Sequence, residues 1–346
     1  MKAATFHGPG DLRLGDVPEP GAGHGELKLR MRATATCGTD AKIFRHGHPR
    51  LVPPQVIGHE LAGEVVEVGG GVQGFAVGDG VQVIAAVPDG ECWACTAGME
   101  TVCPNQTSMG YQYAGGFADY MIVPHQVLKV NGVNRIPDGV SYAEASVTEP
   151  LACALNAQEL ARVGEGDVVV VMGAGPIGCL HVRLARSRGA AEVYLVDVNA
   201  ARLRLSAERV HPDAAIDGSA EDVVDAVVKL TDGRGADVVI TAAPSGRAQE
   251  DAIEMAAPRG RISFFGGLPK DDPIIRCDSN KVHYRELFLI GANGSSPDHN
   301  RRALELIAIG RVPVADLITH RMPLDRVHDA IEAVLSGEAI KVVVEP

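Results

Sequence analysis

Aromatic residues and clusters of positive charge are both scarce in this sequence. Phe, Tyr and Trp make up 4% of the 346 residues, and the net charge is −12 without any run of Lys or Arg. Nucleic-acid surfaces need basic patches and aromatic rings on which bases stack, so this composition argues against nucleic acid as a partner. A small-molecule partner is the better expectation.

Long apolar runs are also missing. No segment approaches the apolar length that crosses a bilayer, and Met1–Gly10 lacks the basic stretch and apolar stretch of a secretory signal. The seven cysteines are an odd count, which fits metal binding and reduced thiols better than a disulfide framework. We therefore predict a cytoplasmic protein without a membrane partner.

Enough apolar sequence is present for two folded domains, since 46% of the 346 residues are hydrophobic. Up to about residue 130 the pattern is strand-like, with Leu27, Leu29 and Met31 alternating with charged residues. After a helical stretch over 143–163, apolar and helical segments alternate, which predicts a parallel sheet flanked by helices. We predict a first domain of residues 1–150 and 294–346 and a second of residues 151–293. The strands expected in the second are 168–172, 192–196, 237–241, 261–265 and 287–290.

A glycine-rich loop follows the first predicted strand of the second domain. The apolar run 168–172 leads into a G-x-G-x-x-G motif, and helical sequence follows it. Such glycines permit a tight turn, let the backbone approach a pyrophosphate and bring helix against strand, while the helix N-terminus faces the phosphates. The residues expected to bind a dinucleotide here are Gly173, Gly175, Pro176, Ile177 and Gly178.

A carboxylate ends the next predicted strand. Asp197 lies where it would accept hydrogen bonds from the adenosine ribose, and it would repel a 2′-phosphate, so the sequence favours NAD over NADP. Arg202 is expected to flank the adenosine end of the cofactor. The alternative is a glycine-rich turn with a structural purpose only, but strand, glycines, helix, strand and acid follow one another as dinucleotide binding requires.

Candidate metal ligands are spread over the first 150 residues. Cys37, His59, Glu60 and Glu149 supply a thiolate, an imidazole and two carboxylates, all of which zinc accepts. Taken singly, they also fit a buried thiol, a core histidine and a charge at a helix N-terminus. Their spacing alone does not establish a shared metal site.

Motifs along nearly the whole chain resemble those of the zinc-containing medium-chain dehydrogenases, and most closely the sorbitol-type polyol dehydrogenases. The resemblance implies an α/β protein with a β-rich GroES-like catalytic domain and a Rossmann domain with a doubly wound parallel sheet. It also implies a homo-oligomer, since this family commonly pairs its cofactor domains through edge strands, here residues 287–292. The motifs are Cys37-Gly38-Thr39-Asp40, Gly58-His59-Glu60-x-x-Gly63, Gly115-Gly116-Phe117-Ala118 and the Gly173 loop.

The resemblance also implies roles for individual residues. Cys37, His59 and Glu149 match the ligands of the catalytic zinc, and Glu60 matches a carboxylate that either ligates the resting zinc or lies just behind it. Thr39 matches the hydroxyl of the proton relay. Lys42 replaces the histidine that continues this relay in some relatives, which leaves the last step of proton release open.

A glutamate at the third ligand position is typical of polyol dehydrogenases. The expected function is therefore zinc-dependent, NAD-linked oxidation of a secondary alcohol of a polyol or sugar alcohol to a ketone. An L-threonine or simple alcohol dehydrogenase is one alternative. A nucleotide-binding protein without catalysis is another, because some relatives of this fold keep the dinucleotide site without the zinc chemistry.

A second cluster resembles the structural zinc loop of the same family. Asp89, Cys92, Cys95 and Cys103 follow its spacing, with Asp89 in place of the first cysteine. Because zinc accepts carboxylate oxygen as well as thiolate, we expect a second, structural zinc here. The alternative is a loop that has lost its metal. The remaining cysteines, Cys153, Cys179 and Cys277, are expected to have no chemical role.

Overall fold

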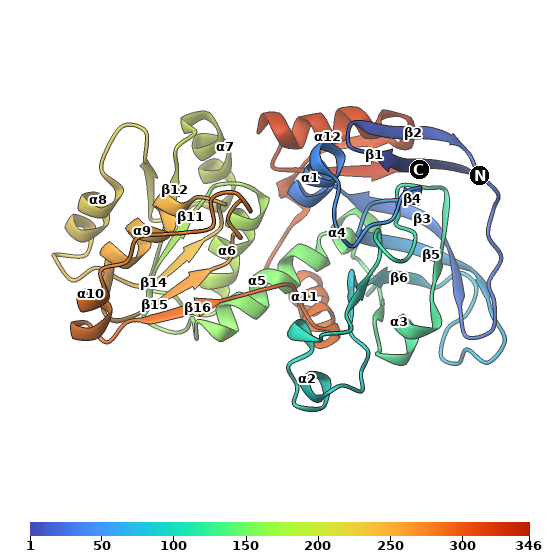
Figure 1. Ribbon diagram of the computed structural model, residues 1–346, viewed down its shortest axis with the longest axis horizontal. Coiled ribbons are helices and arrows are strands. Elements are labelled where there is room, and N and C mark those ends of the chain that lie inside the picture. Colours follow the sequence, from blue (N-terminus) through green and yellow to red (C-terminus); the bar gives the residue numbers. More distant parts are fainter. The chain divides into compact units, whose positions relative to one another are not determined.

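The computed structural model describes residues 1–346 and separates them into two units (Figure 1). The first unit consists of Met1–Ala152 and Gly294–Pro346, and the second of Cys153–Asn293. None of the helices combines the length and the apolar character that crossing a membrane requires.

Strands dominate the first unit. Its main sheet has the order β10-β6-β5-β3-β18-β17, with β9 also paired to β3, and a smaller sheet has the order β2-β1-β4. In β3 (Leu27–Ala35) the alternating residues Leu27, Leu29 and Met31 are buried, as their spacing predicted. The other strands are β1 (Lys2–Gly8), β2 (Asp11–Asp16), β4 (Gln55–Val56), β5 (Glu60–Val68), β6 (Gly80–Val83), β7 (Ala86–Val87), β8 (Thr107–Ser108), β9 (Tyr120–Val123), β10 (Val133–Arg135), β17 (Ile318–Pro323) and β18 (Lys341–Glu345).

The end of the chain returns to this sheet. β18 runs antiparallel to β3, with Val343 opposite Ala35 and Val344 opposite Thr34. α12 (Val327–Ser336) contacts both β18 and α1 (Gly38–His46), and it lies beside α1 in Figure 1. This return brings Lys341, the first residue of β18, close to the end of β3 and the start of α1.

The helical stretch expected over 143–163 is divided in two. α4 (Tyr142–Ser146) ends before Val147, and α5 (Thr148–Leu160) begins after it. A continuous helix would need an N–H group at Pro150 to bond four residues back, and proline has none, whereas it is tolerated in the first turn of a new helix. The other helices of this unit are α2 (Trp93–Thr96), α3 (His125–Lys129) and α11 (Pro297–Ala308), with short 3₁₀ turns η1 (Glu100–Val102), η2 (Ala315–Leu317) and η3 (Leu324–Arg326).

The second unit contains a six-stranded sheet of order β13-β12-β11-β14-β15-β16, and all neighbouring strands are parallel. The five strands expected from the sequence are present as β11 (Val168–Met172), β12 (Glu192–Asp197), β14 (Ala236–Thr241), β15 (Ala256–Phe264) and β16 (Phe288–Gly291). β13 (Ala214–Asp217) was not predicted, because Ile216 is its only large apolar residue and it does not read as an apolar run.

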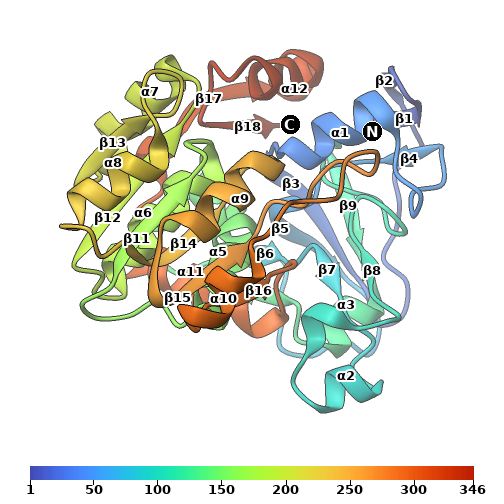
Figure 2. The same cartoon turned by 60° about the vertical axis from the view of Figure 1, so that its left-hand side comes forward.

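Helices connect these parallel strands. α6 (Pro176–Ser187) contacts α7 (Ala200–Val210), whereas α9 (Gly246–Glu254) contacts both α8 (Val223–Leu230) and α10 (Ser279–Tyr284), and Figure 2 shows the second group in front of the sheet. The strand order reverses direction at β11, which is the doubly wound topology that the sequence predicted. The glycine loop follows β11, at this switch in strand order.

Candidate metal and dinucleotide sites

Three predicted metal ligands of the first unit come together. Donor atoms of Cys37, His59 and Glu60 all lie within 4.8 Å of one another. Cys37 is the N-cap residue of α1, and Glu60 is the first residue of β5, so the end of one neighbouring strand and the start of the next bring these side chains together. His59 and Glu60 are buried, and Cys37 is half-buried.

Asp40 holds this donor group in place, a role that our sequence analysis did not assign. Its Oδ2 accepts a 2.8 Å hydrogen bond from the Cys37 backbone N–H, and its Oδ1 lies 3.2 Å from Nδ1 of His59. Because Asp40 contacts Nδ1, the Nε2 atom of the ring is left for another partner. A carboxylate behind a histidine is the usual outer partner of a metal-binding imidazole. The sequence signal was the three-residue spacing of a helix cap from Cys37 to Asp40.

The charges around this group fit a cation. Burial alone would lower the pKa of His59, but Asp40 and Cys37 outweigh it, so the pKa of His59 is raised well above its ordinary value. The surroundings of the donors therefore favour positive charge at His59. A divalent cation bound by Cys37 and His59 would supply that positive charge, and thiolate, imidazole and carboxylate are donors that zinc accepts.

Lys341 supplies a fixed positive charge next to the donors. Its side chain is 2% exposed, contacts the carboxylate of Glu60 and donates a 2.9 Å hydrogen bond to the carbonyl of Thr36. Burial raises the pKa of the Glu60 carboxyl, while Lys341 and His59 lower it. Burial lowers the pKa of Lys341, but Glu60 and Cys37 raise it above the ordinary value for lysine, so the ammonium group stays charged.

Glu149 lies in the first turn of α5 and is 9% exposed. Its charge raises the pKa of both Glu60 and Lys341, which places it near them, but it lies outside the group of Cys37, His59 and Glu60. The structure thus brings Glu60 rather than Glu149 among the close donors. The proposed relay residues differ in exposure: Thr39 is half-buried in the first turn of α1, and Lys42 is exposed on the same helix.

The second predicted cluster also comes together. Donor atoms of Asp89, Cys92, Cys95 and Cys103 lie within 4.8 Å of one another, and the sulfur atoms of Cys92 and Cys103 are 3.7 Å apart. The four residues belong to the loop around α2 and η1, and α2 projects from the rest of the first unit in both views (Figures 1 and 2).

The surroundings of Asp89 favour its ionised carboxylate. Its pKa is lowered by hydrogen bonds from the Cys92 backbone N–H and from the Asn105 side chain, at 3.0 and 2.6 Å. Burial, together with contacts to Asp89 and Cys92, raises the pKa of the Cys95 thiol to about 12. Zinc accepts thiolate and carboxylate ligands, and a zinc ion bound by these four residues would displace the thiol proton of Cys95.

The glycine loop of the second unit has the geometry that its sequence predicted. Gly173 has φ of +118°, which a side chain would strain, and its N–H bonds to the carbonyl of Val196 at 2.7 Å. A Cβ at Gly178 would lie 1.8 Å from the carbonyl oxygen of Gly173, so helix and strand approach only with glycine there. No atom lies within 4 Å of a Cβ built at Gly175, which leaves space above the N-terminus of α6, where Pro176 and Ile177 form the first turn.

Asp197, at the end of β12, is already fully hydrogen-bonded. It accepts the backbone N–H groups of Ala174 and Asn199, each at 2.7 Å, and a bidentate pair from Arg202 at 2.8 and 3.0 Å. Each carboxylate oxygen thus has two donors, which fills its two lone pairs. A ribose hydroxyl can bond to Asp197 only where Arg202 gives up one of its contacts.

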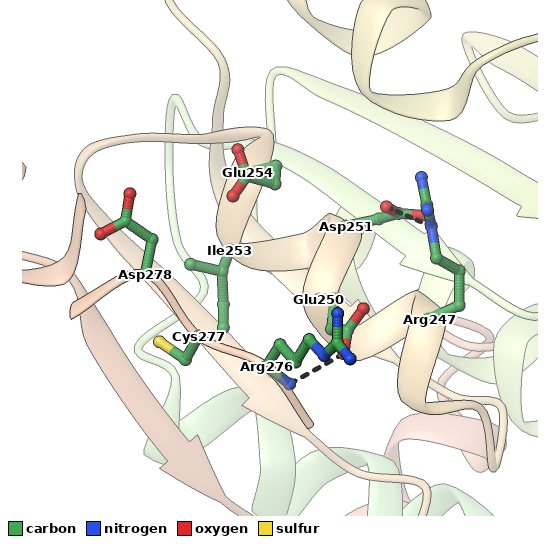
Figure 3. A pocket seen from close by; sticks show the side chains of 8 residues that line it. All are labelled: Arg247, Glu250, Asp251, Ile253, Glu254, Arg276, Cys277 and Asp278. Carbon is green, nitrogen blue, oxygen red and sulfur yellow. Dashed lines mark hydrogen bonds and ion pairs between the residues drawn. The ribbon is translucent and has the colours of Figure 1, made fainter. Parts of the chain in front are cut away.

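A cavity of about 360 Å³ in the second unit lies between α9 and the segment before α10 (Figure 3). Two of its carboxylates have partners in the lining: Asp251 pairs with Arg247 at 2.7 Å, and Glu250 accepts a 2.8 Å hydrogen bond from the Arg276 backbone N–H. The exposed Cys277 lies here, so it is not a core residue, whereas Cys179 is buried and Cys153 is half-buried. No sequence motif pointed to this cavity.

Known proteins similar to this chain match it over nearly its whole length. Residues 23–132 match the alcohol dehydrogenase GroES-like domain, and residues 176–308 match the zinc-binding dehydrogenase family. A sorbitol dehydrogenase of Halalkalibacterium halodurans is 35% identical over 350 residues, covering 100% of this chain and 99% of the relative. An L-threonine 3-dehydrogenase of Pyrococcus furiosus is 35% identical over 333 residues, covering 95% of this chain and 92% of the relative.

Among solved structures, a zinc-binding dehydrogenase of Sinorhizobium meliloti 1021 bound to NADP has a TM-score of 0.93 and 32% identity. The match covers 100% of this chain and 99% of that one. Relatives of this identity, together with a β-rich GroES-like unit and a doubly wound parallel sheet, settle the family. The chain belongs to the zinc-containing medium-chain dehydrogenases, oxidoreductases that act on alcohols.

Proposed function

We propose that this protein is a zinc-dependent, NAD-linked dehydrogenase that oxidises a secondary alcohol of a polyol or sugar alcohol to a ketone. The observation that carries the proposal is the donor group of Cys37, His59 and Glu60, within 4.8 Å of one another and backed by Asp40. Cys37 and His59 would hold the catalytic zinc, with Glu149 as third ligand and Glu60 beside it. When bound, zinc supplies a Lewis acid that makes the substrate's hydroxyl proton more acidic.

The residues around the donors have separate tasks in this proposal. Asp40 fixes the ring of His59 through Nδ1 and presents Nε2 as the donor atom. Thr39 accepts the hydroxyl proton of the substrate and passes it outward. Lys42 follows Thr39 by three positions on α1, a spacing that places both on one face of the helix, and its exposed end is where the proton would reach solvent.

The glycine loop of the second unit would bind the dinucleotide. Free backbone N–H groups at the start of α6, and the open space at Gly175, suit a pyrophosphate. NAD, when bound, supplies the hydride acceptor. Asp197 supports NAD over NADP because a 2′-phosphate would meet its charge, and Arg202 would release Asp197 to the ribose and flank the adenosine. Since a relative of known structure binds NADP, an Asp197→Gly variant should be compared with wild type on both cofactors.

Support for a polyol comes from Glu149, typical of polyol dehydrogenases, and from the sorbitol dehydrogenase among the relatives. The rate of NADH formation should be measured with sorbitol and other polyols, L-threonine and simple alcohols, before and after chelation of zinc. Cys37→Ser should lose zinc and turnover together, while the matched Cys277→Ser, on an exposed cysteine outside the site, should keep both. Activity that survives chelation would refute zinc catalysis. Absence of turnover with every substrate would favour a nucleotide-binding protein.

We also propose that the protein is a homo-oligomer and that it is cytoplasmic. β16 is the edge strand of the second unit's sheet, and it exposes Phe288 (53%) and Leu289 (43%). An open strand edge with apolar side chains is a template for pairing with a second copy. The cytoplasm is supported by the free cysteines of both predicted metal clusters, which need a reducing compartment to stay available.

A further inference from the structure

Tyr111 lies near the metal donors, and none of the sequence motifs includes it. It follows Gly110, which has φ of +77° and where a Cβ would lie 3.1 Å from the carbonyl oxygen of Gly58. Gly58 directly precedes His59, so this loop packs against the backbone that carries the histidine. Burial raises the pKa of Tyr111 to about 12, and the charges of His59, Asp40 and Cys37 all act on it. Its hydroxyl therefore stays protonated, and it lies near enough to the donor group to feel these charges.

Two basic side chains pack on the ring of Tyr111. The His48 ring meets it edge-on, with centroids 4.8 Å apart at 89°, and the guanidinium carbon of Arg50 lies 5.8 Å from its centroid. This is cation–π distance for an arginine. Two glutamines tie the loops together, since Gln55 donates to the carbonyl of Tyr111 at 2.9 Å and Gln112 donates to the carbonyl of Arg50 at 3.0 Å.

Arg50 is exposed and forms no ion pair with any carboxylate of the protein. Most of the arginines that form an ion pair in this structure, such as Arg202 and Arg261, pair with an aspartate. The hydrogen bonds at Arg50 involve its backbone N–H and carbonyl, and its guanidinium lies over the Tyr111 ring. An arginine placed in this way has its planar fork of N–H groups free for a carboxylate or phosphate from outside.

We propose that Arg50, placed by Tyr111, is a specificity-determining residue that selects alcohols with an anionic group near the reacting hydroxyl. This inference rests on the proposed zinc-dependent oxidation of a secondary alcohol; it requires an anionic group in the substrate and so admits hydroxy and amino acids beside phosphorylated polyols. In this proposal the reacting hydroxyl lies at the donors of Cys37 and His59, and the anionic group of the substrate lies on the Tyr111 side of them, at Arg50. The shared chemistry is an anion, which is a carboxylate in a hydroxy or amino acid and a phosphate monoester in a phosphorylated polyol. A neutral polyol needs only hydroxyl partners and gains nothing from Arg50.

The test compares Arg50→Gln with wild type on sorbitol, L-threonine and sorbitol 6-phosphate. Removal of a charge-assisted hydrogen bond should raise the KM of the anionic substrate by about tenfold to a hundredfold, with a smaller change in kcat. The KM for sorbitol should not change. Arg50→Lys keeps the charge without the bidentate fork and should fall between the two. Arg45→Gln removes a charge from the last turn of α1 and is the matched control.

The pattern of losses identifies the anion. A loss confined to L-threonine indicates a carboxylate, and a loss confined to sorbitol 6-phosphate indicates a phosphate. Equal losses on sorbitol and on the anionic substrates, no loss at all, or wild-type preference for sorbitol would overturn the proposal.

A binding measurement separates this proposal from the function on which it rests. Calorimetry with the zinc-loaded protein, without dinucleotide, measures binding of L-threonine and sorbitol 6-phosphate directly. If the wild type turns over nothing, the proposed function fails. The inference then survives only where one of these anions binds wild type and Arg45→Gln but binds Arg50→Gln at least about tenfold more weakly.

Discussion

Lys341 and Glu60 offer the sharpest test of the first unit. The pair is buried, with Lys341 2% exposed and Glu60 fully buried, and Lys341 also donates to the carbonyl of Thr36. Replacing Lys341 by methionine keeps most of the side chain's length but leaves the carboxylate of Glu60 without its cation. Removing one partner of a buried ion pair costs about 3–5 kcal/mol, because the other charge stays buried alone.

This cost is large enough to measure as a melting temperature. For a folded unit of this size, each kcal/mol lowers the melting temperature by about 2–4 °C, so Lys341→Met should lower it by about 6–20 °C. Glu60→Gln should lower it too, because it leaves the ammonium group of Lys341 without its carboxylate. The double variant buries a neutral amide beside a thioether and removes both charges. Its loss should therefore be well below the sum of the two single losses.

Urea unfolding at pH 7.5, with and without chelator, gives the three differences in free energy of unfolding. Measuring in chelator removes any contribution from lost metal, and the coupling between positions 60 and 341 should persist there. Additive effects of the two substitutions would refute the argument, since they would mean that the two charges do not depend on each other. Lys42→Met removes an exposed lysine from the same unit and should change stability by less than about 0.5 kcal/mol.

Three further predictions test other parts of the chain. Asp89→Ala should lower the zinc content by one atom per chain and leave catalytic zinc in place, as elemental analysis would measure; unchanged content would refute a metal in this loop. Burial lowers the pKa of His181 to about 3, below its unfolded value, so the neutral ring stabilises the fold above about pH 6.5 and this contribution is lost as the pH falls. In urea unfolding, lowering the pH from 7.5 to 5 should therefore reduce the free energy of unfolding by about 2 kcal/mol more in the wild type than in His181→Gln. Equal reductions in the two proteins would contradict this. Leu289→Lys on β16 should reduce the molar mass measured by light scattering, and an unchanged mass would exclude pairing through this edge.

Much of the fold was predictable because it depends on local patterns. Five of the six parallel strands were recognised as apolar runs, and the glycine loop was recognised because Gly173 and Gly178 are required by backbone geometry. β13 was missed because Ile216 is its only large apolar residue, whereas the equally short β16 is apolar at Phe288, Leu289 and Ile290. The break between α4 and α5 was missed because the composition of residues 143–163 favours one helix, and Pro150 was not taken as the start of a new one.

The candidate site was predictable only in part. Cys37 and His59 lie in short motifs, and Asp40 lies within one of them, although its contact with His59 requires β3 and β5 to be neighbours. Lys341 lies 305 residues beyond Thr36, whose carbonyl it contacts, and no local pattern marks it. Its position follows from the antiparallel pairing of β18 with β3, which is a property of the folded sheet. Buried charges brought in by a distant strand are therefore the kind of site residue that sequence reasoning misses.

The same ion pair bears on which glutamate binds the metal. Glu60 lies among the close donors, but its carboxylate already has the ammonium group of Lys341 as a partner, and part of its charge is neutralised there. A carboxylate so neutralised is a weaker donor to zinc, so we expect Glu149 to be the third ligand. On this reasoning Glu149→Gln should lose more catalytic zinc on dialysis against a weak chelator than Glu60→Gln does. Lys341→Met should reverse the order, because Glu60 is then left with the metal as its only cation.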